Sequence, residues 1–257
     1  MSNCIIGYTG FVGKNLVKQK KFSNLFNTKN IDSIHKYKFD LALVCAPHAK
    51  KWWANKNPKE DSAISKNLIK SLKKLKTKKI VLISTIDVFH HKQNLDENSR
   101  IMIDQSNAYG KNRLKIEKFI QNNFRNYHII RLPALYGKFL KKNILFDLIH
   151  NNNLADVRLK SQYQWYFVEN LMSDINKIIK YNIKKINLVT EPIKTSEIVK
   201  LFFKKKLSFL NVKELGPTYN LKTLHNKIFN SKKGYIINKK DNLRKMKLFI
   251  KNEIISF

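Results

Sequence analysis

The stretch "CIIGYTGFVGKNLVKQ", residues 4–19, decides the fold because it combines an apolar strand, a tight turn and the start of a helix. Gly7, Gly10 and Gly13 are spaced G-x-x-G-x-x-G. Such glycines allow a tight turn and let the backbone approach a pyrophosphate, while the helix that follows supplies free N–H groups and a positive dipole end. The stretch therefore predicts a nucleotide-binding turn, and the alternative interpretation is a purely structural turn.

Apolar runs of strand length alternate with amphipathic segments through the first half of the chain. The runs are "FDLALVCAP" (39–47), "KIVLIST" (79–85) and "YHIIRLPALYG" (127–137), and apolar residues recur at helical spacing in 61–76 and 108–124. Strands that are apolar throughout and alternate with helices indicate a parallel sheet covered on both faces. The sequence predicts an α/β, Rossmann-type doubly wound parallel sheet. Beyond residue 138 the pattern loosens.

The net charge of +33 is the strongest compositional signal in the 257 residues. It suits binding to nucleic acid or to an anionic membrane surface, but it also suits a lysine-rich surface that reflects overall composition. Only six of the 51 basic residues are arginine, whereas dedicated nucleic-acid binders rely on arginine for bidentate contacts. We favour the compositional interpretation and predict no specific nucleic-acid partner, keeping charge-driven binding as a hypothesis.

Other features of the sequence argue against a membrane span, a signal peptide and a metal site. No apolar run approaches the roughly 20 residues that span a bilayer, and we expect no membrane span. The start of the chain lacks the pattern of a signal peptide. Cys4 and Cys45 stand in apolar runs and are interpreted as buried thiols of a reducing compartment, which points to the cytoplasm. The neighbouring His90 and His91 favour a loop pair over a metal ligand set, so no metal site is predicted.

The end of the second strand bears on the choice of cofactor. An acidic residue there would hold the adenosine ribose hydroxyls, whereas a basic or small polar residue would tolerate a 2′-phosphate. The segment "LFNTKNI" offers Asn27, Thr28 and Lys29, and no acid. The sequence therefore favours NADP(H) over NAD(H).

Two hydroxyl-bearing segments follow the central strands. Ser84 and Thr85 end a strand, where side chains face the ligand crevice of an open parallel sheet. Tyr109 and Arg113 stand at i and i+4 of a predicted helix and share one face. A free tyrosine titrates near pH ~10, and a fixed cation beside it would lower that pKa. This pair is a candidate acid/base with its cation; an ordinary amphipathic helix is the alternative.

The motifs G-x-x-G-x-x-G, "STIDVF", "YGKNRLKIE" and "RLPALYG" resemble, in their order, the extended short-chain dehydrogenase/reductase family. Within it they resemble the nucleotide-sugar epimerase, dehydratase and reductase branch. The resemblance covers residues 1 to about 140 and extends weakly through "YQWYFVENL". It implies an NAD(P)-binding domain at 1–140 and a smaller α/β substrate-binding lobe at 141–257, some of whose strands could return to the main sheet. It also implies a homodimer through the helix that carries Tyr109.

The resemblance also implies roles for individual residues. Thr85 would hydrogen-bond the reacting sugar oxygen, Tyr109 would be the acid/base, and Arg113 would replace the usual lysine, orienting the nicotinamide ribose. Trp52 could stack on a base or sugar, although packing of the Trp52–Trp53 loop onto the core is favoured. The implied cofactor contacts are Gly7, Thr9, Gly10, Phe11, Val12, Gly13, Thr28, Lys29, Cys45, Ala46, Pro47, Arg113 and Pro133, and the implied substrate contacts are Ser84, Asp87, Trp52, Asn143 and Gln164.

Three departures from the family pattern narrow the expected reaction. Arg113 keeps the positive charge of the lysine but cannot give up a proton. Dehydratases of this branch carry paired acids after the threonine, whereas Ile86 precedes Asp87 here, which favours a reductase or epimerase over a 4,6-dehydratase. Gln164 stands where an arginine often contacts the nucleotide diphosphate, and Lys141, Lys142 and Asn143 could compensate.

The leading hypothesis is a cytoplasmic NAD(P)-dependent oxidoreductase that acts on a nucleotide-activated sugar, as in surface-polysaccharide synthesis. Hydride would move between the nicotinamide and a sugar carbon while Tyr109 transfers the proton. The alternative is a non-catalytic dinucleotide-binding sensor or assembly protein, in which Arg113 marks lost chemistry.

Overall fold

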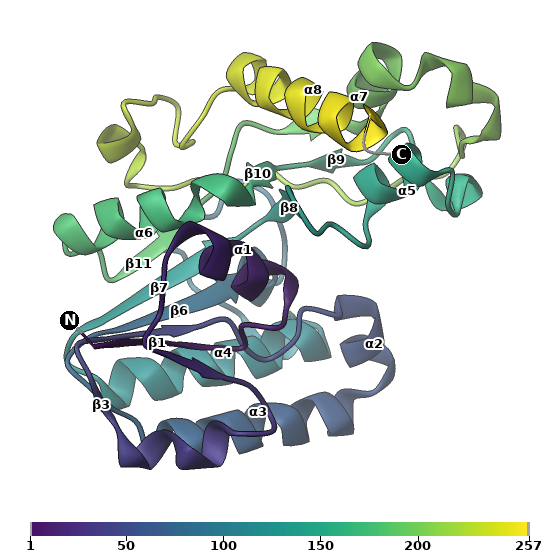
Figure 1. Ribbon diagram of the computed structural model, residues 1–257. Helices are drawn as coiled ribbons and strands as arrows, with labels where there is room; N and C mark the ends of the chain where they lie inside the picture. The colour runs from purple at the N-terminus through teal and green to yellow at the C-terminus, as the bar shows by residue number, and fades with distance from the viewer. Residues whose placement is uncertain (1, 256–257) are drawn as a thin grey trace. The chain divides into compact units, whose positions relative to one another are not determined.

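The computed structural model describes residues 2–255 and divides into two compact units (Figure 1). Unit 1 runs to His91 and also contains Asn98–Leu132 and Glu169–Ile186. Unit 2 contains Lys92–Glu97, Pro133–Val168 and the chain from Asn187 onward. Unit 1 thus takes a segment from well beyond residue 140, and the division of function at that residue stays a prediction.

Unit 1 is built on a six-stranded sheet in the order β11-β7-β6-β4-β1-β2. Every pairing from β7 to β2 is parallel. The strand order reverses between β1 and β4, so the carboxyl ends of these two strands flank the switch point where open α/β sheets bind ligands. The strands are β1 Asn3–Ile6, β2 Asn24–Phe26, β4 Leu41–Val44, β6 Ile80–Thr85, β7 Tyr127–Leu132 and β11 Lys185–Asn187.

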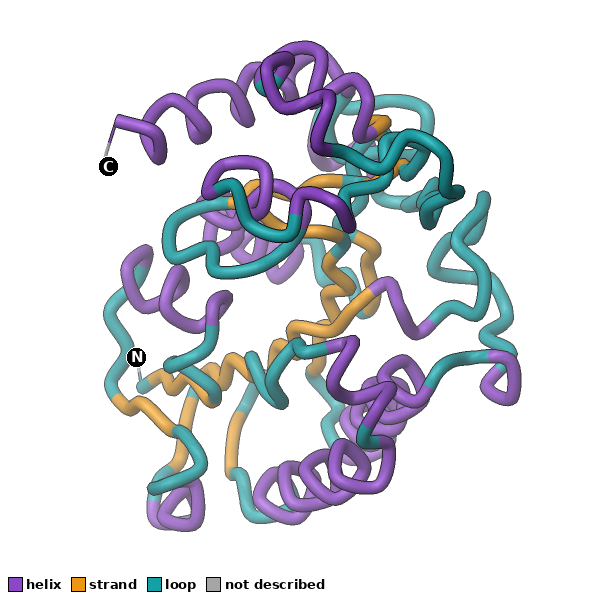
Figure 2. Tube along the Cα trace, turned by 90° about the vertical axis from the view of Figure 1, so that its right-hand side faces the viewer, coloured by secondary structure: helices purple, strands orange, loops and turns teal. Residues whose placement is uncertain are grey.

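Helices cover both faces of this sheet, as the apolar strands require. Figure 1 shows α1 (Phe11–Gln19) and α6 (Leu171–Lys180) on one face and α3 (Pro58–Leu72) and α4 (Ala108–Asn123) on the other. The view turned by 90° shows the strands running between helices (Figure 2). Buried side chains of β1, β4, β6 and β7 pack with those of α3 and α4 in one apolar core. The predicted doubly wound α/β fold is confirmed.

Short elements connect the main ones in unit 1. The helix α2 (Lys51–Lys56) leads into α3, and β3 (Lys38–Phe39) pairs in parallel with β5 (Lys76–Thr77). Short 3-10 helices also occur in or next to unit 1. They are η1 Ile31–Lys36, η2 Ile86–Val88 and η3 Ile103–Gln105, with η5 Val168–Asn170 before α6.

Unit 2 has its own core around two short sheets. The strand β8 (Ala134–Tyr136) pairs in parallel with β10 (Trp165–Phe167), and β9 (Gln162–Tyr163) pairs antiparallel with β12 (Ile193–Lys194). These strands pack with α5 (Ile144–His150), α7 (Thr195–Phe202) and α8 (Lys239–Ile255). The 3-10 helices of this unit are η4 Leu154–Asp156, η6 Lys204–Phe209 and η7 Asn226–Phe229.

No helix within residues 2–255 is both long enough and apolar enough to cross a bilayer.

Candidate functional site

The glycine turn after β1 is fixed by close backbone contacts. Gly7 adopts a φ of +86°, and a Cβ added there would lie 2.8 Å from the carbonyl oxygen of Cys45. A Cβ on Gly13 would lie 2.2 Å from the carbonyl oxygen of Gly7. Both positions therefore require glycine, because any side chain would push β1, the turn and α1 apart.

The third glycine has a different environment. Gly10 is the N-cap of α1, makes no side-chain cap, and a Cβ there would meet its nearest atom, the Gly7 carbonyl oxygen, at 3.5 Å. The first turn of α1 carries no acidic residue. An uncapped helix start with an open approach can accept the phosphates of an anionic ligand. This cradle fits the pyrophosphate of a dinucleotide, with Thr9, Phe11 and Val12 alongside.

The end of β2 carries small polar and basic groups. The side-chain amide of Asn27 donates to the hydroxyl of Tyr8 at 3.1 Å, and its Oδ1 accepts from the backbone N–H of Lys29 at 2.8 Å. Thr28 and Lys29 are exposed. A ligand at this strand end would therefore meet an amide, a hydroxyl and a free-standing lysine chain rather than a carboxylate.

The residues that follow β4 and β7 lie at the carboxyl edge of the sheet. The N–H of Cys45 donates to the Ile6 carbonyl at 2.8 Å, which brings the segment of Ala46 and Pro47 beside the end of β1. Cys45 is half-buried, and the loss of hydration raises the pKa of its thiol to about 12, so the thiol stays protonated at neutral pH. Pro133 directly follows β7 at the sheet's carboxyl edge and begins the next segment of unit 2.

The last two residues of β6 carry hydroxyl groups, of which one stays at the edge of the sheet and the other is turned into the core. Thr85 ends the strand, and its Oγ1 accepts from the N–H of Asp87 at 3.1 Å, which starts η2. Ser84 donates instead to the carboxylate of Glu117, which forms a buried ion pair with Arg131 at 2.7 Å. Thr85 thus remains the better-placed candidate, while Ser84 serves a buried network in unit 1.

Three contacts fix the start of α4, where Tyr109 lies. Asn107 caps the helix by accepting from the N–H of Gly110 at 2.9 Å. The N–H of Tyr109 donates to Oδ1 of Asn55 in α2 at 3.1 Å. A Cβ on Gly110 would lie 2.2 Å from the carbonyl oxygen of Asp87, so α4 begins directly against η2. These contacts place Tyr109 next to the segment that carries Thr85.

Arg113 lies against Tyr109 and is held by an acid. Its Cζ lies 4.4 Å from the centre of the Tyr109 ring. Its two terminal nitrogens donate to the two carboxylate oxygens of Asp61 in α3, at 3.0 and 2.9 Å, and one of them also donates to the His48 carbonyl at 3.0 Å. The structure therefore brings Tyr109 and Arg113 together, but the positive charge of the arginine is already paired.

The pKa of Tyr109 corrects one expectation. Burial, reinforced by Asp87, raises this pKa above its ordinary value, whereas Arg113 and Lys51 act to lower it. Arginine does favour the tyrosinate, as expected, but the loss of hydration outweighs it because the tyrosine is only 5% exposed. Without a ligand, Tyr109 is a protonated phenol, able to act first as an acid.

Two residues that were expected to contact substrate have structural roles in unit 2. Gln164 is 1% exposed; its amide nitrogen donates to the carbonyls of Thr190 and Leu221, and its oxygen accepts from the Leu221 N–H. Asn143 caps α5 through its Oδ1, and its Nδ2 donates to the Leu135 carbonyl. The polar atoms of both side chains already make hydrogen bonds within unit 2, which disfavours both residues as ligands of a diphosphate.

Of the two tryptophans in α2, one packs against a neighbouring ring and the other is exposed. Trp53 packs edge-on against His48, with ring centres 5.1 Å apart. Trp52 is 62% exposed, contrary to the expectation that it packs onto the core. Its ring is therefore accessible for stacking, and its role as a substrate contact stays a prediction.

The NAD dependent epimerase/dehydratase family matches residues 4–187, which include both the glycine turn and the Tyr109 helix. The chain belongs to this family. A search of curated proteins finds no match.

Solved structures show the same fold for this epimerase/dehydratase family member. The dTDP-4-dehydrorhamnose reductase from Bacillus anthracis in complex with NADP is 20% identical, with a TM-score of 0.67 and all of both chains covered. RMD from Pseudomonas aeruginosa complexed with NADPH is 15% identical, with a TM-score of 0.74 over 100% of both chains. The UDP-N-acetylglucosamine 4-epimerase from Methanobrevibacter ruminantium is 12% identical, with a TM-score of 0.76 over 100% of this chain and 99% of that one.

Three residues lie at the site of this family member without a signal in the sequence. Asp61 lies inside α3 and pairs with Arg113. Lys51 pairs with Asp87 at 2.7 Å. Asn55 binds the Tyr109 backbone. Sequence periodicity marks which residues share a helix face, but it does not say which other helix that face meets.

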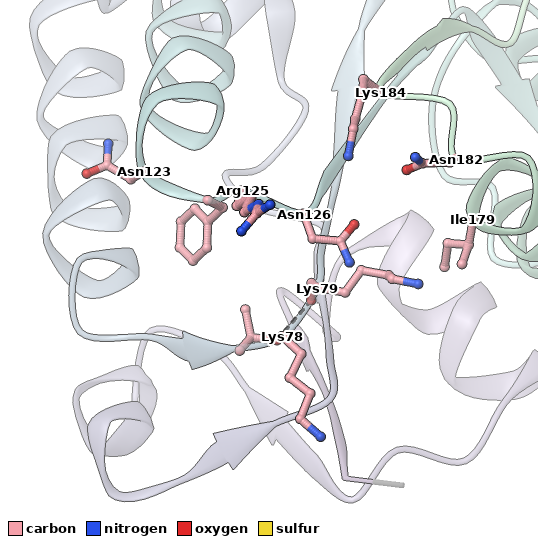
Figure 3. Close-up of a pocket in the computed structure, with 10 residues that line it drawn as sticks. Lys78, Lys79, Asn123, Arg125, Asn126, Ile179, Asn182 and Lys184 are labelled. Atoms are coloured by element: carbon pink, nitrogen blue, oxygen red, sulfur yellow. Dashed lines mark hydrogen bonds between the residues drawn. The ribbon is translucent and has the colours of Figure 1, made fainter.

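A basic cavity lies at the amino edge of the unit 1 sheet, opposite the carboxyl edge that carries the glycine turn and Thr85. Its lining residues come from the segments that precede β6, β7 and β11, and none of them is acidic. Figure 3 shows Lys79, Asn126 and Lys184 around it. The glycine turn and Thr85 lie at the carboxyl ends of their strands, whereas the residues that line the cavity lie before the amino ends of theirs. The cavity is therefore separate from the candidate active site; its cations are Lys78, Lys79, Arg125 and Lys184.

Proposed function

We propose that this family member is an NADP(H)-preferring reductase or epimerase that acts on a nucleotide-activated sugar. The observation that carries the proposal is the packing of buried Tyr109 on the guanidinium of Arg113, beside the segment that ends in Thr85. A phenol with an adjacent cation and a neighbouring hydroxyl is a suitable proton-transfer site for a sugar carbonyl or hydroxyl. Support for the class of substrate comes from neighbours described as a dehydrorhamnose reductase and an N-acetylglucosamine epimerase.

The glycine turn is the proposed dinucleotide site. Gly7 and Gly13 shape it, and the open N-terminus at Gly10 would hold the pyrophosphate. When bound, the nicotinamide would supply or accept hydride. Asn27, Thr28 and Lys29 favour a 2′-phosphate, in keeping with neighbours solved with NADP and NADPH. Arg113 would orient the ring of Tyr109, and Thr85 would hydrogen-bond the reacting sugar oxygen.

In this proposal Tyr109 starts the reaction as the acid. Its hydroxyl is protonated in the free protein, so it can give a proton to the sugar oxygen that gains negative charge during reduction. The neighbouring hydroxyl of Thr85 and the cation of Arg113 would stabilise the charge that develops on the two oxygens. Since the acids of a dehydratase are incomplete at Ile86 and Asp87, elimination of water is disfavoured.

A non-catalytic dinucleotide-binding protein is the second candidate. The pairing of Arg113 with Asp61 favours it, because an arginine paired with a carboxylate lowers the pKa of Tyr109 less than an unpaired cation at the same place would. This protein would bind NADPH and sense it without turning it over.

The deciding experiment is fluorescence titration of the wild type, Tyr109→Phe and Arg113→Ala with NADPH and NADH, followed by a turnover screen of nucleotide-sugars. We expect micromolar NADPH binding, roughly −8 kcal/mol, in the wild type and Tyr109→Phe, and turnover only in the wild type. Absence of binding by either dinucleotide would overturn the enzyme proposal. Tight binding without turnover of any nucleotide-sugar would favour the sensor.

A further inference from the structure

The cavity at the amino edge of the unit 1 sheet has a volume of about 650 Å³ and no task in the proposed function. Its lining comes from residues 77–79 and 123–126 and from Ile179, Asn182 and Lys184, all of which belong to unit 1. Pockets that hold small molecules have volumes of this order. The residues around the cavity therefore bear on whether it holds a ligand, and on which kind.

Three of the four cations at the cavity lack an acidic partner. Lys78 pairs with Asp40 at 2.8 Å, and in Figure 3 its side chain points away from those of Lys79 and Lys184. Lys79, Arg125 and Lys184 form no ion pair with any acid of residues 2–255. Lys79 and Lys184 are also half-buried, so both have lost part of their hydration without gaining a carboxylate. A bound anion would compensate for that loss.

The charge of the cavity lining is positive even after the helix ends are counted. The carboxyl ends of α4 and α6 reach the cavity through Asn123 and Ile179. Each helix end carries about −0.5 of an elementary charge, so the three unpaired cations leave roughly two positive charges. None of the described residues that line the cavity is acidic. The lining thus suits a ligand with two or more negative charges.

The backbones of the two half-buried lysines are fixed by the sheet. The Lys79 carbonyl accepts from the N–H of Ala42 at 2.9 Å, and the Lys184 carbonyl accepts from the N–H of Ile129 at 2.8 Å. The strand β7 lies between β6 and β11, so the backbones of the two lysines are two strand spacings apart, about 10 Å. Their flexible stems can converge on one ligand from that separation. The frame of the site is therefore present before a ligand arrives.

Uncharged groups complete the lining. The side-chain amides of Asn126 and Asn182 make no hydrogen bond to another residue of 2–255, so both can bind a ligand oxygen. Phe124 and Ile179 are half-buried and offer apolar surface to the same cavity. A single inorganic ion would leave this surface unused. The lining therefore suits an organic molecule that carries phosphate groups.

We propose that this cavity binds a phosphorylated small molecule of nucleotide size, with Lys79 and Lys184 holding its phosphates. A phosphate chain carries two or more negative charges, and lysine binds phosphate as a point charge. Nucleic acid suits the site less, because its backbone needs cations spread along an exposed groove, whereas these two lysines are half-buried in one cavity. The inference does not depend on the proposed function.

The proposed site is distinct from the glycine turn. The strand β6 begins directly after Lys79 and has six residues, ending at Thr85. The two edges of the sheet are therefore roughly 20 Å apart. A nucleotide in the cavity and a dinucleotide at the glycine turn would not touch, so the protein should bind both at once.

The test is isothermal titration calorimetry with ATP as the probe, alone and with saturating NADPH, at about 150 mM salt. We expect one bound ATP per chain with a Kd below ~1 mM. Lys79→Met combined with Lys184→Met should weaken ATP binding by about tenfold or more, whereas Lys79→Arg combined with Lys184→Arg should retain it. Inorganic triphosphate should bind more weakly than ATP, and adenosine should not bind.

Lys59→Met combined with Lys66→Met is the matched control, because it removes the same charge from exposed positions of α3. It should change the ATP affinity by less than about twofold. Equal losses in the two double variants would show that ATP responds to overall charge, which overturns the proposal. An absence of ATP binding, or tighter binding of an RNA oligonucleotide that depends on Lys79 and Lys184, would also overturn it. If the Lys79–Lys184 double variant fails to fold, the two single variants decide the question.

Gly10→Ala separates the cavity from the glycine turn. It should leave ATP binding unchanged, because Gly10 lies at the opposite edge of the sheet. If NADPH displaces ATP and Gly10→Ala weakens ATP, the probe occupies the glycine turn and the proposal fails. If neither NADPH nor NADH binds, the proposed function fails, while the comparison of the lysine variants with ATP still decides the cavity.

Discussion

Asp61 and Arg113 form a two-point ion pair in the interior of unit 1, with nitrogen–oxygen distances of 2.9 and 3.0 Å between side chains that are almost fully buried. The pair joins α3 to α4 across 52 residues of sequence. Two charges removed from water are tolerated because each offsets the other and neighbouring groups add hydrogen bonds, such as the one from Arg113 to the His48 carbonyl. Their mutual dependence makes the pair a sensitive point for both stability and the candidate site.

The first prediction follows from that dependence. Asp61→Asn leaves the Arg113 charge buried without its counterion, and we expect a loss of about 3–5 kcal/mol in the free energy of unfolding. Urea denaturation followed by circular dichroism measures it. Glu60→Gln, at the exposed preceding position, is the control and should change stability by less than about 0.5 kcal/mol.

A double variant separates lost pairing from lost packing. Asp61→Leu with Arg113→Met replaces both charges by apolar groups, and we expect it to recover most of the stability lost in Asp61→Asn. If Asp61→Asn were as stable as the wild type, the ion pair would not be needed to hold α3 against α4.

The central sheet could be predicted from the sequence because its signals are local. Continuous apolar runs gave the strands, and the glycine spacing after Ile6 gave the turn into α1. The partner of Arg113 could not be predicted in this way. Asp61 occupies an ordinary place in the first turns of α3, and nothing in its neighbourhood shows that α3 and α4 face each other at these positions.

The second prediction concerns the glycine turn. Gly13→Ala places a Cβ within 2.2 Å of the Gly7 carbonyl oxygen, so the turn must open. We expect both a loss of stability, by about 1–3 kcal/mol, and a loss of NADPH binding. Thermal unfolding and fluorescence titration measure the two effects.

Gly10→Ala is the informative partner of this variant. Its Cβ would meet only the Gly7 carbonyl oxygen, at the ordinary distance of 3.5 Å, so the fold should tolerate it. The methyl group would still project at the helix start where the pyrophosphate is proposed to lie. We expect near-normal stability with NADPH binding weakened at least tenfold, about 1.4 kcal/mol. Unchanged binding in Gly10→Ala would argue against phosphate binding at this turn.

The third prediction concerns the choice between NADPH and NADH. Asn27→Asp is nearly isosteric, and its Oδ1 can still accept from the N–H of Lys29. The new carboxylate would repel a 2′-phosphate and could bind ribose hydroxyls instead. We expect the ratio of NADPH to NADH affinity to fall by at least tenfold in paired titrations, about 1.4 kcal/mol. Lys29→Ala should weaken NADPH alone, and equal losses for both dinucleotides would contradict this placement of the 2′-phosphate.

Buried polar networks in unit 2 also escaped prediction, for a related reason. Glu97 belongs to a polar segment that reads as a solvated loop, yet it is 5% exposed and accepts hydrogen bonds from Asn187, Thr223 and Leu224. Gln164 is similar. A polar residue's partners lie up to 127 residues away in sequence, and composition alone does not distinguish a buried carboxylate from a surface one.

The fourth prediction concerns stability in mild acid. His128 is 1% exposed, and burial lowers its pKa below the ordinary ~6.5. The unfolded chain therefore binds a proton that the folded chain resists, so the free energy of unfolding should fall as pH drops below ~6.5, by at most about 1.4 kcal/mol per pH unit. His128→Gln should flatten this slope in urea denaturation between pH 7 and 5, leaving a part from His48, whose pKa burial also lowers. His35→Gln, at an exposed position, is the control, and an unchanged slope in His128→Gln would show that other groups cause the acid sensitivity.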